Sequence, residues 1–288
     1  MLVRVVFDYA LIALIIVIVE RNQGFLLYLL AIMMIGARQV GLGSVALHDG
    51  AHHLLFKARR TNDFFANAIL FSLLAPLVGI RLKSYRAVHI AHHRTVNTSE
   101  DPDYPNFENW FSWSRKRMVF TYALLLTGIP FLMFAFRRFK SVSRPTQALE
   151  LIGIAALIIC LVLHIRIAEL FALYWLAPLA TWGFFINFVR SAAEHCPPGT
   201  LRDDAYVPAI FRTAEIVNSP FDSIFVATRG VNYHLTHHLF PSVPFYRLKT
   251  LQRELATVEE YQRYSNVTCG YHRYLVRFFT RNRHDMLV

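Results

Sequence analysis

Long apolar runs separated by short polar turns dominate the pattern of residues along this chain. Residues 5–19 and 25–47 form one pair of runs, interrupted only by the polar turn at residues 20–24. Residues 149–163 and 168–189 form a second pair around another short turn. A helix needs about 20 apolar residues to cross the core of a bilayer, and each run approaches that length. The pattern therefore predicts four transmembrane helices in two hairpins.

Two further apolar segments, residues 64–80 and 119–136, contain proline and have basic residues at both ends. The basic residues lie at positions 57–60, 81–86, 115–117 and 137–140. Basic residues beside membrane segments favour the cytoplasmic side, so both ends of each segment are expected there. We therefore predict re-entrant or interfacial helices for both segments, and cytoplasmic chain termini. The alternative for residues 119–136 is a tilted span.

The composition indicates a membrane protein rather than a soluble one. Of the 288 residues, 55% are apolar and only 17% are charged, whereas about 25% is usual for charged residues in soluble domains. The net charge of +11 comes from basic residues beside apolar runs, which indicates membrane orientation and not nucleic-acid binding. We predict one all-α integral membrane domain over residues 1–288, with a cytoplasmic helical cap formed by residues 48–117 and 190–288.

Nine of the thirteen histidines fall into three clusters and one single position. In chain order they are His48, His52, His89, His92, His93, His195, His234, His237 and His238. Helical residues three or four apart share a face, so each cluster presents several imidazoles to one side. Adjacent residues such as His92 and His93 diverge by about 100° around a helix, which suits two metal ions better than one. His48 and His52 can converge on a single ion.

A metal site is the interpretation that this pattern favours, because the predicted topology places all three clusters on the same face of the membrane. Imidazole binds iron, copper, nickel and zinc, so the ligand type alone does not identify the metal. The alternative is a polar network or a pH-sensing group of histidines. His164, His272 and His284 lie away from the clusters and are expected to be solvated or structural.

Other polar residues near the clusters are candidates for holding the ligands in place. A ligating imidazole usually donates its second N–H to a carboxylate or carbonyl group. The candidate acceptors are Asp49, Glu100, Asp101, Asp103, Glu194 and Asp222. His53, which follows His52, and Asn232, two residues before His234, are further candidates for contacting a ligand or a water molecule.

The histidine clusters resemble the conserved boxes of the membrane-bound fatty acid desaturase and hydroxylase superfamily. Residues 86–93, followed by the acidic residues 100–103, are similar to its second box. Residues 232–246 are similar to its third box, and residues 48–53 to its first. This resemblance implies two non-haem irons in a cytoplasmic cap above four spanning helices, with the nine histidines named above as ligands. His195 matches an additional ligand that precedes the third box.

The resemblance also implies an oxygen-dependent reaction on a fatty acyl or related lipid chain. A desaturase would introduce a double bond, whereas a hydroxylase, ketolase or oxidative decarboxylase could use the same scaffold. The acyl chain is expected between the spanning helices, near residues such as Phe71, Leu74 and Phe185. Electrons must come from a separate ferredoxin, rubredoxin or cytochrome, since the chain has no cysteine cluster and no cytochrome motif. The basic residues Arg81, Lys83, Arg86, Arg247 and Lys249 could attract an acidic donor.

Two other classes of protein fit the sequence less well. A carboxylate-bridged di-iron bundle is disfavoured because the chain contains no Glu-x-x-His sequence. A non-enzymatic metal-binding protein or a metal transporter would need ionisable residues within its spans. The predicted spans contain few such residues, notably Asp8 and Arg38, and the histidines lie outside them.

Overall fold

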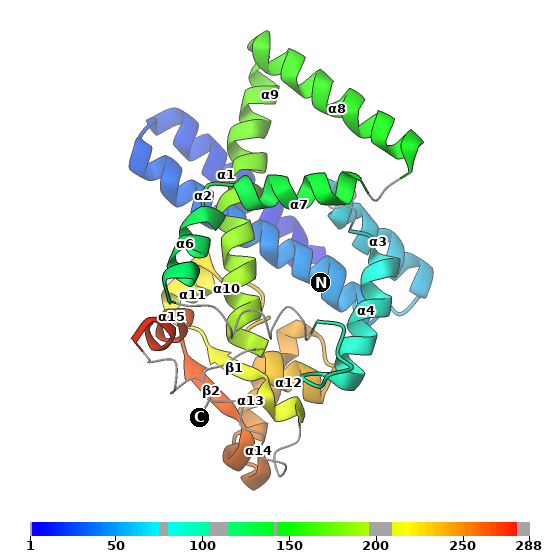
Figure 1. Ribbon diagram of the computed structural model, residues 1–288, viewed down its shortest axis with the longest axis vertical. Helices are drawn as coiled ribbons and strands as arrows, with labels where there is room; N and C mark the ends of the chain where they lie inside the picture. The colour runs from blue at the N-terminus through cyan, green and yellow to red at the C-terminus, as the bar shows by residue number, and fades with distance from the viewer. Residues whose placement is uncertain (1, 75–79, 104–114, 141–142, 196–208, 281–288) are drawn as a thin grey trace.

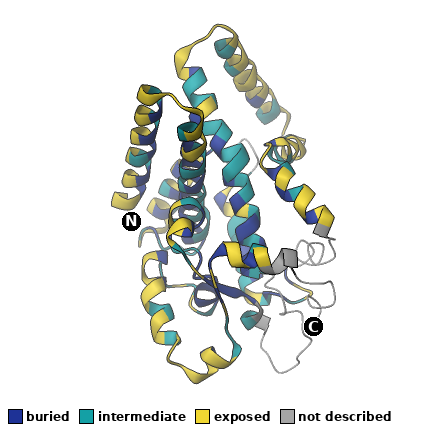
Figure 2. Ribbon diagram, turned by 90° about the vertical axis from the view of Figure 1, so that its left-hand side faces the viewer, coloured by how far each residue is buried: buried dark blue, intermediate teal, exposed yellow. Residues whose placement is uncertain are grey.

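The computed structural model describes residues 2–74, 80–103, 115–140, 143–195 and 209–280. Pro76, residues 106–114 of the expected cap, and His284 lie outside the described residues. The described chain is mostly helical, and long helices lie above a cap of short helices that carries two strands (Figure 1). Figure 2 shows that buried residues line the inner faces of the long helices, while exposed residues line their outer faces.

Four helices are long and apolar enough to cross a membrane. They are α1 (Leu2–Asn22), α2 (Phe25–Ser44) with its extension to Asp49, α8 (Arg144–Val162), and the continuous helix Arg166–His195, which contains α9 (Arg166–Phe171) and α10 (Phe184–His195). These helices cover the four predicted ranges to within one residue. The helical hairpins are thus present, and several helices continue beyond the apolar runs.

Two of these helices contain π-helical turns on the way to the cap. One π-helical turn covers Val45–Asp49 at the end of α2, and two others cover Ala172–Leu176 and Leu179–Gly183 between α9 and α10. A π turn inserts an extra residue into a helix and is frequent at functional sites. One π-helical turn therefore contains His48 itself, and the other two alter the direction of the side chains that follow them on the helix that ends at His195.

The segments predicted not to cross are both interrupted. The first forms α3 (Arg59–Ser72), which ends at Ser72, and α4 (Leu82–Thr95) follows. The second forms α6 (Arg115–Leu125) and α7 (Ile129–Phe139), which are bent by 77° relative to each other at a break that contains Gly128. A positive φ of 77° at Gly128 permits this turn. Such a bend is that of a broken span or a re-entrant loop.

The cap is built from short helices and adds one small two-stranded sheet to the predicted helical architecture. It contains α11 (Pro220–Phe225), α12 (His234–Leu239), α13 (Phe245–Leu255), α14 (Glu259–Tyr264) and α15 (Tyr271–Thr280). It also contains β1 (Ala214–Val217) and β2 (Asn266–Cys269), which pair in parallel with Ala214 opposite Asn266. The all-α prediction missed this pair because four-residue strands far apart in the sequence show no local periodicity.

Two of the candidate spanning helices pack closely where α2 passes the π-helical part of the Arg166–His195 helix. A Cβ atom on Gly36 would lie 2.9 Å from both the Gly183 nitrogen and the Pro178 carbonyl oxygen. Gln39, one turn further along, donates from Nε2 to the Trp175 carbonyl at 2.9 Å. Backbone therefore lies against backbone at Gly36, and no larger residue fits there without movement.

A buried ion cluster joins α1 and α2 to the cap. Asp8 is fully buried on α1, and its carboxylate lies 3.6 Å from Arg38 on α2. Arg229, in the loop before α12, also donates to the Asp8 carboxylate and to the Arg4 carbonyl. Asp8 and Arg38, the ionisable residues singled out in the first two predicted spans, are thus paired inside the protein, as buried charges usually are.

We predict that Gly36→Ala lowers the free energy of unfolding by about 1–3 kcal/mol, because the added methyl group meets two backbone atoms. Thermal unfolding of the detergent-purified protein measures this effect. Gly153→Ala on α8 is the matched control, since a Cβ there has no atom within 4 Å. Equal unfolding midpoints for both variants would contradict the close packing at Gly36.

Candidate metal centre

Four structural elements bring the nine predicted histidines together. His48 lies in the π-helical turn that extends α2, and His52 follows it within one turn. Helix α4 carries three of the histidines, the end of α10 carries His195, and α12 carries the last three. Two potential spanning helices thus deliver histidines directly to the cap helices.

The histidines form two groups, each with four nitrogen atoms within 4.8 Å of one another. Cluster A consists of His48, His89, His93 and His237, and cluster B of His92, His195, His234 and His238. The adjacent pairs on α4 and α12 divide between the clusters, as their divergence around a helix predicted. His89 and His93, four residues apart on α4, both belong to cluster A, and His234 and His238 on α12 both belong to cluster B.

Short distances between ring nitrogens define cluster A. The Nε2 atom of His89 lies 3.0 Å from that of His52 and 3.2 Å from that of His93. The Nε2 atom of His93 also lies 2.9 Å from that of His237. The His52 ring is therefore adjacent to cluster A and lies against the rings of all four of its members. The ring of His48 completes the cluster, with its centroid 3.9 Å from that of His237.

Cluster B has the same kind of geometry. The Nε2 atom of His195 lies 3.2 Å from that of His92 and 2.8 Å from that of His234. His234 in turn lies 3.0 Å from His238 between the same atoms. The His93 and His238 rings stack with their centroids 4.2 Å apart, so the two clusters lie side by side.

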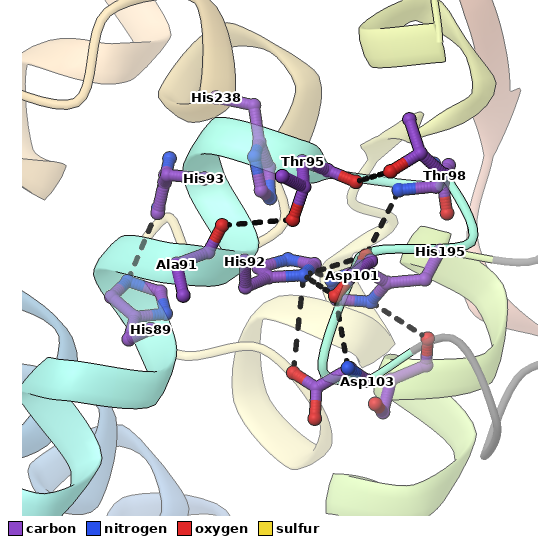
Figure 3. Close-up of polar contacts among 12 residues, drawn as sticks. His89, Ala91, His92, His93, Thr95, Thr98, Asp101, Asp103, His195 and His238 are labelled. Atoms are coloured by element: carbon purple, nitrogen blue, oxygen red, sulfur yellow. Dashed lines mark hydrogen bonds and ion pairs between the residues drawn. The ribbon is translucent and has the colours of Figure 1, made fainter.

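Asp101 fixes which nitrogen of His92 carries the proton (Figure 3). Nδ1 of His92 lies 2.8 and 2.9 Å from the two carboxylate oxygens of Asp101. Burial raises the pKa of this carboxyl group, but hydrogen bonds from His92 and from backbone N–H groups outweigh burial and lower it overall. An ionised carboxylate only accepts hydrogen bonds, so His92 donates from Nδ1 and presents the lone pair of Nε2 to cluster B.

His195 is oriented in the same way. Its Nδ1 atom lies 3.1 Å from the Ser191 carbonyl oxygen, which can only accept a hydrogen bond. The Nε2 lone pair of His195 therefore faces the Nε2 lone pair of His92 at 3.2 Å. Two lone pairs at this distance repel each other unless a cation lies between them. The residues of cluster B thus fit a metal ion.

A hydrogen-bond network without a cation does not explain the clusters. Each nitrogen of a neutral imidazole offers either one N–H or one lone pair. His89, His93, His195 and His234 each face two other imidazoles with a single nitrogen. Burial, followed by the neighbouring histidines, lowers the pKa of His52 to about 3 and that of His93 to about 2. Neutral imidazoles crowded in this way are suited to metal binding and not to pH sensing near neutrality.

Two other predicted carboxylates lie near the histidines. A carboxylate oxygen of Asp49 is 3.6 Å from Nδ1 of His48, and one of Glu194 is 3.8 Å from Nδ1 of His234. Glu194 is buried, pairs with Arg190 at 3.2 Å, and accepts a hydrogen bond from the Tyr271 hydroxyl at 2.5 Å. Both carboxylates therefore lie near an imidazole nitrogen but beyond hydrogen-bond distance of it.

The remaining candidates lie elsewhere or have another contact. Asp222 caps α11 by accepting from the Ser219 backbone N–H and hydroxyl group. Glu100 is exposed, and His53 lies 3.7 Å from the carboxylate of Asp63. Asn232 donates to the Ile216 carbonyl at 2.6 Å, so it ties the loop before α12 to β1. Asp103 lies 3.9 Å from His92, beyond Asp101.

The structure shows a contact of Arg86 that the sequence did not predict. Its guanidinium group contacts both carboxylate oxygens of Asp63 at 3.0 and 2.5 Å. It also donates to the carbonyl groups of Gly50 and Ala51. Arg86 therefore joins α4 to the end of the helix that carries His48, and the separation of these residues in sequence concealed that role.

Phe71 and Phe185, which were both expected beside an acyl chain, lie in different surroundings. Phe71 was expected beside an acyl chain between the spanning helices, but it is 75% exposed on the surface of α3. Phe185 is partly buried and packs against Tyr122 and Trp182. Sequence reasoning also missed Glu215, a fully buried carboxylate that contacts Thr236 within the third histidine cluster. Its position in the apolar segment Ala214–Val217 was the available signal.

Comparison with known proteins agrees with the resemblance drawn from the histidine clusters. The family model for fatty acid desaturases matches residues 23–268, a range that contains all nine histidines. The curated dihydrorhizobitoxine desaturase of Bradyrhizobium elkanii is 29% identical over 250 residues, which cover 79% of this chain and 67% of that protein.

We predict that Asp101→Ala weakens metal binding at cluster B by about 10- to 100-fold, because His92 loses the acceptor that fixes its orientation. Competition with a chelator, followed by metal analysis of the purified protein, measures the change. Glu100→Ala is the matched control, since this neighbouring side chain is exposed. A similar affinity in both variants would show that Asp101 does not orient the site.

Proposed function

The chain belongs to the fatty acid desaturase family, and we propose that it is an oxygen-dependent desaturase that introduces a double bond into a fatty acyl or related lipid chain. The observation that carries this proposal is the pair of adjacent four-histidine clusters, A and B. Four helices able to cross a membrane, together with the family, indicate a membrane protein. A lipid substrate suits such a protein, because it shares the bilayer with the helices.

Two non-haem irons are the cofactor that we propose for the clusters. His48, His89, His93 and His237, with His52 beside them, would hold one iron, and His92, His195, His234 and His238 the other. Iron is compatible with imidazole ligands. When bound, two irons supply the activation of dioxygen that removal of hydrogen from an unactivated C–H bond requires.

The protein's own contribution is to hold neutral imidazoles in fixed directions and to limit access of water. His92, His237 and His238 are almost completely buried, so bulk water does not surround the metal positions. Asp101 and the Ser191 carbonyl group hold the outward-facing nitrogens of His92 and His195. Such pre-organisation lowers the reorganisation needed when the metal and the substrate bind.

We also propose that the metal centre and both chain termini are cytoplasmic. The support for this is the distribution of basic residues around the apolar segments. An acidic ferredoxin, rubredoxin or cytochrome would then supply electrons from the same side. Lys83, Arg247 and Lys249 are exposed on the cap helices α4 and α13 and could attract such a donor.

The name of the curated relative favours desaturation over hydroxylation, ketone formation or oxidative decarboxylation. That relative is named for dihydrorhizobitoxine. An identity of 29% does not transfer a substrate between two chains. The lipid substrate proposed for this chain rests on its membrane helices.

We predict that expression of the protein in a host cell adds an unsaturated acyl product, and that His237→Ala removes this product because cluster A loses one of its four imidazoles. Gas chromatography and mass spectrometry of total fatty acids measure the product. His164→Ala is the control, since this side chain is 86% exposed in the turn before α9 and distant in sequence from the clusters.

A hydroxylated or shortened product would retain the metal centre and replace the desaturase reaction by one of the alternatives. No new product in cells that contain metal-loaded protein and a supply of electrons would contradict the proposed function.

We predict that Lys83→Glu combined with Lys249→Glu slows reduction by an acidic donor by about tenfold at low ionic strength, because electrostatic attraction speeds association. Stopped-flow reduction at two salt concentrations measures this rate, and the difference should shrink at high salt. Lys140→Glu, on the exposed end of α7, is the control. Unchanged rates in the double variant would contradict docking at this surface.

A further inference from the structure

A buried carboxylate on β1 contacts α12, the helix that carries His234, His237 and His238. Glu215 is fully buried, although it belongs to neither cluster A nor cluster B. Strand β1 and helix α12 lie side by side in the cap (Figure 1). A buried carboxylate destabilises a fold unless hydrogen bonds compensate for lost hydration. Glu215 is therefore a costly residue at a position where a smaller apolar residue would suffice for packing.

One oxygen of Glu215 makes all of its hydrogen bonds among the described residues. Its Oε2 atom accepts from the Thr236 backbone N–H at 2.9 Å, from the Thr236 hydroxyl at 3.1 Å and from the Tyr261 hydroxyl at 3.3 Å. Burial raises the pKa of the Glu215 carboxyl to about 8, and these hydrogen bonds act in the opposite direction. The contacts join β1, α12 and α14 at a single atom.

The contact with Thr236 supplies a hydrogen-bond acceptor for a backbone N–H group at the start of α12. The first four backbone N–H groups of a helix have no acceptor within the helix. The residue before α12, Tyr233, makes no side-chain capping hydrogen bond. Glu215 accepts from the Thr236 N–H group instead, and so performs from a neighbouring strand the task of a capping side chain.

The direction of Thr236 shows why this contact does not disturb the metal clusters. Thr236 lies about 200° around the helix from both His234 and His238, and about 100° from His237. Glu215 therefore holds α12 from the side opposite the two members of cluster B. A rotation of α12 would displace all three imidazoles together.

Strand β1 holds the same segment at a second place. The Ile216 N–H group donates to the Asn232 carbonyl at 3.0 Å, and the Asn232 side chain donates to the Ile216 carbonyl at 2.6 Å. The contacts at Asn232 and Thr236 lie on either side of His234 in the sequence. Strand β1 thus fixes both the position and the rotation of the segment from Asn232 to Thr236, which carries His234.

We propose that Glu215 is a positioning residue that sets the orientation of α12, and thereby the ligand geometry at both metal positions. This inference rests on the proposed metal-binding function of the clusters. Glu215 touches neither substrate nor metal, and acts through Thr236.

Cobalt(II) substitution tests the proposal, because the visible absorption spectrum of cobalt reports ligand geometry. The full-length protein, purified in detergent, is titrated with cobalt(II) as wild type, Glu215→Ala, Glu215→Gln and Glu215→Met. We expect Glu215→Ala to change the cobalt spectrum and weaken binding by about tenfold. Glu215→Gln should restore most of the wild-type spectrum, because its amide oxygen still accepts from Thr236. Glu254→Ala, exposed on α13, is the control.

A purely structural role for Glu215 would lower the unfolding temperature and leave the cobalt spectrum and affinity unchanged, and that result would overturn the proposal. If Glu215→Ala does not fold, Glu215→Met decides the question, because methionine has a similar length but does not accept from the Thr236 N–H group: a wild-type cobalt spectrum in that variant would overturn the proposal, and an altered one would support it. A wild-type protein that binds cobalt at both clusters but forms no lipid product would overturn the desaturase function alone.

Discussion

The repulsion between imidazole lone pairs is the constraint on which the rest of this structure depends. Asp101 and the Ser191 carbonyl group direct the Nε2 lone pairs of His92 and His195 towards each other at 3.2 Å. A cation turns this repulsion into coordination, whereas its absence leaves several uncompensated contacts in each cluster. The histidines must therefore be held in place by interactions outside the clusters, and the surrounding structure supplies these interactions.

The supporting interactions come from parts of the chain that are distant in sequence. Arg86 joins α4 to the end of the helix that bears His48. Strand β1 holds α12 through Asn232 and Thr236. Close packing at Gly36 and the buried Asp8 pairs fix the potential spanning helices relative to one another and to the loop before α12. Rigid support of this kind is what keeps ligands pre-organised for a metal.

Local patterns in the sequence predicted the helical hairpins and the division of His92 and His93 between two clusters, because each depends on helical periodicity or on the length of apolar runs. The β1–β2 pair, the internal role of Arg86 and the contact of Glu215 with Thr236 were not predictable. These features join residues that are far apart in the sequence, and no local signal records such pairings. The exposed position of Phe71 likewise depends on how α3 packs.

The iron content of the purified protein tests the central claim most directly. Anaerobic reconstitution of the detergent-purified chain with iron(II), removal of loosely bound metal and mass-spectrometric metal analysis give the number of irons per chain. Clusters A and B predict two irons per chain. No retained iron after reconstitution of a folded chain would contradict the account, because the converging lone pairs would then have another cause.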